Sequence, residues 1–124
     1  VSLTPSATSS QVLIFCSIYF GRGNGNSGFL VQLLRGSTIL GAGAGSGNRQ
    51  TGIATIESTL DTYTMNSSSF NFLDSPSTSN AVTYKIQTKS RDGSEVSINA
   101  SSADPNLVYG QRVSSTITAM EVLA

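Results

Sequence analysis

The sequence predicts an all-β fold, an antiparallel β-sandwich of about eight strands that is jelly-roll-like in its organisation. Short apolar segments recur at even spacing along the 124 residues, and several alternate apolar with polar residues, which is the period of a strand. Clusters of Gly, Ser, Asn and Pro separate these segments as turns do. The immunoglobulin pattern is absent, since the chain has one Cys and no Trp. A jelly roll is therefore the simplest interpretation, although periodicity does not fix the order of strands.

The chain is organised around Gln11–Phe20 (QVLIFCSIYF), its longest apolar run. The run is short, rich in β-branched and aromatic residues and followed by glycines, so we interpret it as a strand rather than a buried helix. Successive strand side chains point to opposite faces, and here both faces are mostly apolar. A strand covered on one side only would alternate apolar with polar residues. We therefore expect the second face to lie against another copy of the chain, in an interface that contains Leu13, Phe15 and Tyr19 together with the last strand.

The other strands of the N-terminal half follow from similar signals. Val1–Thr4 is a short strand that Pro5 ends. Phe29–Arg35 and Thr38–Leu40 are separated by a Gly-Ser turn and form a hairpin. Thr51–Leu60 is the next strand. Two glycine-rich stretches, residues 21–28 and 41–50, are loops because Gly and Asn tolerate the backbone conformations that turns require.

The C-terminal half contains the clearest alternation in the chain, at Asn80–Arg91. An Arg-Asp-Gly turn follows, and Glu95–Ala100 is expected to return from it with Ile98 facing inward. Residues 101–112 form a long loop. The two remaining strands of this half are Tyr63–Asp74 and Ser114–Leu123.

The composition is that of an uncharged polar β domain. Charged residues make up 11% of the chain, against about 25% in a typical globular domain. Lys plus Arg equals Asp plus Glu, at 7 each, so nothing favours nucleic acid, which attracts basic patches. No apolar run is long enough for a membrane span. The length suits a single domain, residues 1–124, and because no Met begins it, we expect the C-terminal part of a longer chain.

The sequence offers little for catalysis. It has no His, which excludes Ser-His-Asp and Cys-His mechanisms and the commonest metal ligand. Cys16 lies within the central apolar strand, where we expect a small buried hydrophobe. The acidic residues fall mostly at strand ends and turns, and neither glycine-rich loop has the spacing of a nucleotide-binding motif. We therefore expect a non-enzymatic protein with no catalytic residue, no metal and no cofactor.

Loops are the places to look for binding residues, because they lie on the surface and tolerate variation. The simpler interpretation is that these loops are solvated connections. The candidates are Arg22, Asn24 and Asn26 in the first glycine-rich loop, Asn48 and Arg49 in the second, and Tyr109 in the long loop.

Several segments together resemble a known family. They are LTPSATSSQVLIFCSI, GFLVQLLRGSTILGAG, GNRQTGIAT, FNFLDSPSTSNAVTYKIQ and STITAMEVLA. In this order they resemble the C-terminal β domain of virion structural proteins of tailed bacteriophages, especially aquatic ones, such as tail-fibre or capsid-surface proteins. The family usually has a further segment upstream that this chain lacks.

The resemblance implies a compact jelly-roll-like domain, commonly trimeric, located on the virion and displayed outside the particle. Its partners would be other copies of itself, other virion proteins, and a glycan or receptor on the host surface. It implies no enzymatic activity and transfers no binding residue. It leaves open whether the domain is a fibre tip, a fibre segment or a capsid decoration.

Three functions remain after these considerations. The first is a virion surface protein that assembles, as a trimer, and mediates attachment to the host surface or to the capsid. The alternative is a carbohydrate-binding module or lectin-like domain, for which Tyr63 and Tyr109 are the available stacking platforms. A small hydrolase is the least favoured, because no catalytic motif supports it.

Overall fold

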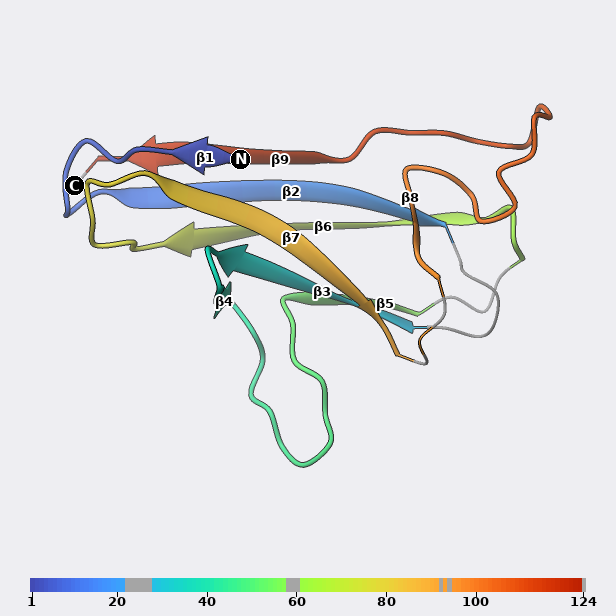
Figure 1. The fold of residues 1–124 in the computed structure, drawn as a ribbon, viewed down its shortest axis with the longest axis horizontal. Helices are drawn as coiled ribbons and strands as arrows, with labels where there is room; N and C mark the ends of the chain where they lie inside the picture. Colours follow the sequence, from blue (N-terminus) through green and yellow to red (C-terminus); the bar gives the residue numbers. More distant parts are fainter. Residues whose placement is uncertain (22–27, 58–60, 92, 94, 124) are drawn as a thin grey trace.

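The structure is a computed structural model that describes residues 1–21, 28–57, 61–91, 93 and 95–123. Within these residues nine strands and no helix are found, and the strands form two antiparallel sheets (Figure 1). The predicted antiparallel β-sandwich is therefore confirmed. The first sheet consists of β1 (Ser2–Leu3), β7 (Val82–Ser90), β3 (Gly28–Arg35), β4 (Thr38–Leu40) and β5 (Ala54–Glu57). The second sheet consists of β6 (Met65–Asp74), β2 (Gln11–Gly21), β8 (Ser97–Ile98) and β9 (Thr116–Val122).

The central strands of the two sheets, β2 and β3, pair with strands that are distant in sequence. β2 pairs along its length with β6, from Val12 opposite Asp74 to Gly21 opposite Met65, and over its first half with β9. β3 pairs with β7 on one side and with β4 and β5 on the other. The chain crosses repeatedly from one sheet to the other, so most neighbouring strands within a sheet are distant in sequence.

The core lies between the two sheets and contains the residues that alternation predicts. On β2 the inward positions are all buried: Val12, Ile14, Cys16, Ile18 and Phe20. Opposite them lie the inward residues of the first sheet, chiefly Val31, Leu33, Val82 and Tyr84. At one end of this core the rings of Phe20 and Phe29 stack with their centroids 6.2 Å apart. Burial of these apolar side chains is the main term that stabilises the sandwich.

A buried polar cluster, which we call the Asp74 clamp, joins the two sheets. It consists of Asp74 on β6 with Arg35 and Tyr84, which lie opposite each other on β3 and β7. The guanidinium of Arg35 donates to both carboxylate oxygens of Asp74, at 2.9 and 2.8 Å, and the Tyr84 hydroxyl donates to Oδ2 at 2.7 Å. Asp74 is only 5% exposed. Burial and this hydrogen bond raise the pKa of Tyr84 above its usual value.

The hairpin predicted in the first sheet is confirmed, and one predicted strand is shorter than expected. Arg35 pairs with Thr38, and Gly36 between them has φ of +59°, a conformation that glycine adopts without strain. The strand predicted over residues 51–60 is β5, which begins at Ala54. Its predicted residues 58–60 lie outside the described part of the chain.

The predicted hairpin between β7 and the segment after it is wrong. β8 pairs instead with the end of β2 in the other sheet, with Ile98 opposite Phe20. β9 pairs with β2 only as far as Ser17. The backbone of β2 after Ser17 therefore needs another hydrogen-bond partner on that edge, and β8 provides it. The Asn99 amide donates to the Tyr19 carbonyl there, at 3.1 Å. Ile98, predicted to face the core, is 41% exposed.

The Asp74 clamp predicts that two Asp→Asn substitutions differ in how much they destabilise the fold. Asp74→Asn should lower the free energy of unfolding by about 2 kcal/mol, because it removes the charge that the partly buried guanidinium of Arg35 pairs with. Asp104→Asn, the matched control, breaks an exposed ion pair with Arg112 and should leave the urea midpoint nearly unchanged. Equal losses in urea unfolding would show that the buried pair contributes no more than the surface one.

Candidate functional site

The outward side of the sheet β6-β2-β9 carries an exposed apolar surface. Residues directly opposite on neighbouring strands share a face. Leu13 lies between Leu73 on β6 and Met120 on β9. Phe15 lies in the next outward row, between Asn71 and Thr118. We call the surface formed by Leu13, Phe15, Leu73, Met120 and Val122 the apolar face.

The side chains of the apolar face keep much of their surface in solvent. Phe15 is 44% exposed, Leu73 47% and Met120 52%. Large apolar side chains gathered in one place on a protein surface usually mark an interaction site. The sequence predicted Leu13 and Phe15 as interface residues, and the structure places both here. Met120 lies in the last strand, which was also expected in the interface. Leu73 was not predicted, because the alternation of one strand does not show which strands lie beside it.

The apolar face ends along β2 at a row of small hydroxyl side chains. Ser17 lies opposite Ser69 and Thr116, and the Ser69 hydroxyl donates to that of Ser17 at 3.1 Å. Tyr19, the third predicted interface residue, shares the face but lies beyond this row, opposite Ser67. The structure therefore joins Leu13 and Phe15 in one surface and separates Tyr19 from them.

A second candidate region lies where the long loop between β8 and β9 meets the segment before β6, which contains Tyr63. The rings of Tyr63 and Tyr109 meet edge to face, with centroids 5.1 Å apart and an interplanar angle of 84°, and both are exposed. In the same loop Arg112 donates to both oxygens of Asp104, at 2.9 and 2.6 Å. The hydrogen bond from Arg112 lowers the pKa of Asp104. The predicted candidate Tyr109 is thus held against Tyr63.

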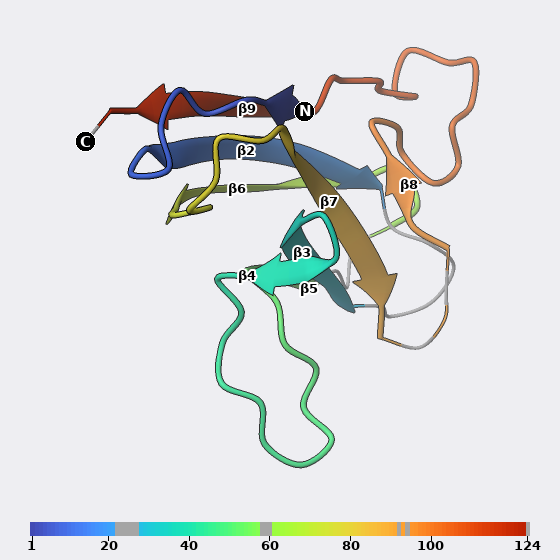
Figure 2. The same cartoon turned by 60° about the vertical axis from the view of Figure 1, so that its left-hand side comes forward.

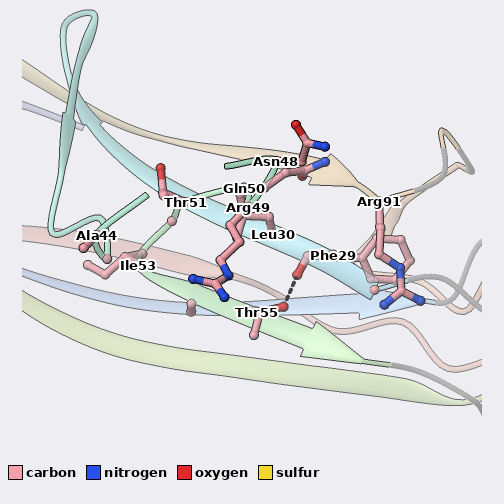
Figure 3. A pocket seen from close by; sticks show the side chains of 14 residues that line it. Phe29, Leu30, Ala44, Asn48, Arg49, Gln50, Thr51, Ile53, Thr55 and Arg91 are labelled. Carbon is pink, nitrogen blue, oxygen red and sulfur yellow. Dashed lines mark hydrogen bonds between the residues drawn. The ribbon is translucent and has the colours of Figure 1, made fainter. Parts of the chain in front are cut away.

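A third region is the groove beside the loop that joins β4 to β5. This loop extends away from both sheets (Figure 1), as the turned view also shows (Figure 2). Between it and β3 lies a groove of about 550 Å³, the loop groove, and two predicted candidates, Asn48 and Arg49, line it (Figure 3). Arg91 also lines it, but was not singled out because its Arg-Asp-Gly context resembles a plain turn. The other predicted loop candidates, Arg22, Asn24 and Asn26, lie outside the described residues.

Cys16 is buried in the core, as the sequence predicts. Burial raises the pKa of its thiol, so the reactive thiolate is disfavoured. In the described part of the chain no three His, Cys, Asp or Glu side chains come together as metal ligands would. The same residues contain no helix of the length and apolarity needed to cross a membrane.

Comparisons with protein-family models, with curated proteins and with solved structures return no match for this chain. The functional interpretation therefore depends on the surfaces described above and on the sequence segments.

The burial of Cys16 predicts slow thiol chemistry in the folded protein. Maleimide should label Cys16 much more slowly in buffer than in urea, because the folded state withholds the thiol from solvent and disfavours its ionisation. A variant with Cys16→Ser and Gln87→Cys is the control, since Gln87 is exposed and should be labelled rapidly in both. Rapid labelling of native Cys16 would contradict its placement.

Proposed function

We propose that the chain is a non-enzymatic virion surface domain that assembles with two further copies of itself through the apolar face. The observation that carries the assembly is the partial exposure of Leu13, Phe15, Leu73 and Met120 on one side of one sheet. Covering such a surface removes apolar area from water, at roughly 25 cal/mol per Å². Interfaces between permanently associated copies are apolar in this way.

The two outer faces of the sandwich differ, and this difference gives the domain an orientation in the assembly. On the outward side of the other sheet, β7 presents four exposed polar residues: Thr83, Lys85, Gln87 and Lys89. Such a face is suited to solvent. In a ring of three copies, each apolar face would turn toward the shared axis and each polar face would stay outside, so one closed ring covers all three apolar faces.

The placement on a virion is supported by the sequence segments that resemble phage structural proteins, such as LLRGSTILG and ITAMEVLA. Such a domain would attach the particle to the host surface or bind to the capsid. Low charge and loops rich in Ser, Asn and Gly suit a displayed module, because uncharged polar side chains adapt their hydrogen bonds to many partners.

Assembly through the apolar face predicts that one negative charge placed on this face will separate the copies. Phe15→Asp should reduce the mass in solution from that of three chains to that of one, because a carboxylate would have to be buried without a partner. The measurement is size-exclusion chromatography with light scattering, with circular dichroism to verify folding. Gln87→Asp, the same charge on the outward side of the other sheet, should leave the trimer intact. A folded Phe15→Asp variant that stays trimeric would refute this interface.

The alternative is a carbohydrate-binding module, favoured by the exposed Tyr63 and Tyr109. Their edge-to-face arrangement turns one ring against the other, so together they offer less flat surface than the parallel platforms on which sugar rings stack. If the tyrosines bind sugar, Tyr109→Ala should abolish binding to a panel of neutral glycans. A wild-type protein that is monomeric and binds neutral glycans would favour this alternative over the virion domain.

A further inference from the structure

The sandwich is open along one side, between β7 and β9. β1 lies on this side but pairs only with the beginning of β7 (Figure 2). Beyond β1 a cleft of about 310 Å³ lies between the two sheets, and we call it the side cleft. Three isoleucines from three strands line it: Ile18 of β2, Ile86 of β7 and Ile117 of β9. The side cleft therefore leads from solvent to apolar side chains of the core.

The edge of β7 beside the side cleft has backbone groups that are free to pair. The Val1 amino group donates to the Tyr84 carbonyl at 2.9 Å, and the Tyr84 amide donates to the Val1 carbonyl at 2.8 Å. Successive residues of a strand direct their backbone groups to opposite sides, so those of Ile86 and Thr88 point to the same side as those of Tyr84. Within the described residues no backbone hydrogen bond reaches them there. Such an edge is a template for pairing with a further strand.

The inward side of an added strand would have to be apolar. Tyr84 and Ile86 pack against the core, and residues directly opposite on neighbouring strands share a face. A side chain opposite Ile86 would therefore enter the side cleft, where Ile18 and Ile117 lie. An apolar side chain is favoured there, because filling the cleft removes apolar surface from water.

The outward side of an added strand would have to be acidic. Lys85 and Lys89 are exposed on β7, and neither forms an ion pair with a described residue. An acidic side chain opposite Gln87 would lie diagonally between the two lysines, and one opposite Lys89 would pair with it directly. A second copy that paired through the same edge would bring lysine against lysine, which is unfavourable. The charge of this edge therefore favours an acidic strand from a different protein.

We propose that the edge of β7 and the side cleft bind an extended segment of a different protein, in which acidic residues alternate with apolar ones. The segment adds to the first sheet as an antiparallel strand in line with β1. Its apolar side chains lie opposite Ile86 and Thr88, and its acidic side chains lie opposite Gln87 and Lys89. In binding of this kind the backbone hydrogen bonds supply affinity and the alternate side chains supply specificity.

This site goes beyond the proposed function and does not depend on it. The side cleft is entered beside β7, which belongs to the first sheet, whereas the apolar face is the outward side of the second sheet. Either surface can therefore be tested while the other is left unchanged.

The test is a titration of the wild-type protein with two peptides, acetyl-Glu-Val-Glu-Val-amide and acetyl-Lys-Val-Lys-Val-amide, followed by amide hydrogen exchange in NMR spectra. The acidic peptide should slow exchange at Ile86 and Thr88. The basic peptide should bind about tenfold more weakly, because it sets like charges opposite each other. Lys85→Glu combined with Lys89→Glu should reverse this preference. Arg49→Glu, the matched control in the loop between β4 and β5, should preserve it.

A second measurement compensates for the weak binding expected of so short a peptide. The residues Glu-Val-Glu-Val are joined ahead of Val1 through one threonine, which holds them beside β7 at an effective concentration on the order of millimolar. This fusion should raise the urea midpoint above that of a fusion with the order Val-Glu-Val-Glu. The second order turns the acidic side chains into the side cleft, because a shift of one residue exchanges the two faces of a strand.

Four results would overturn the inference. The two peptides bind equally well, exchange slows on β6 rather than at Ile86 and Thr88, or neither the acidic peptide nor its fusion has any effect. The fourth is protection of Ile86 and Thr88 in the wild-type protein alone that increases with protein concentration, because a second copy would then cover this edge.

Discussion

The Asp74 carboxylate fixes the position of one sheet against the other. Its two donors, Arg35 and Tyr84, lie opposite each other in the first sheet, while Asp74 itself lies opposite Val12 in the second. A shift of any of these strands by one residue would turn a donor or the acceptor to the outside, and a buried charge would lose its partner. The clamp thus sets the strand registers together, and every surface described above depends on those registers.

Once the registers are set, the two outward faces acquire opposite character. β2 has apolar side chains on both sides, so the core takes Val12 and Ile14 while Leu13 and Phe15 remain outside. β7 is polar on its outward side. The same sandwich therefore presents one surface suited to contact with protein and one suited to water and soluble ligands. The loop groove belongs to the sheet of the second surface and not to that of the apolar face.

Alternation along the sequence was enough to find most strands and inward residues such as Val82 and Tyr84, and to predict that Leu13 and Phe15 share a second apolar face on the same strand. It could not find the partner of β8, because a turn signal says nothing about which sheet edge is vacant. It could not find the Asp74 clamp either, since Arg35 and Asp74 each resemble an ordinary residue at a strand end. The loop groove lies between β3 and the loop that joins β4 to β5, and periodicity along the sequence does not show that Arg49 and Leu30 line the same groove.

The pairing of β2 with β9 also determines when β2 can complete its hydrogen bonds during synthesis. β2 precedes β9 by more than ninety residues in the sequence, so the most apolar segment is synthesised well before its pairing is complete. Contacts between segments so far apart in sequence form slowly, and strands that wait for them are prone to aggregate. A nascent chain therefore exposes the second edge of its most apolar strand until β9 has also been synthesised.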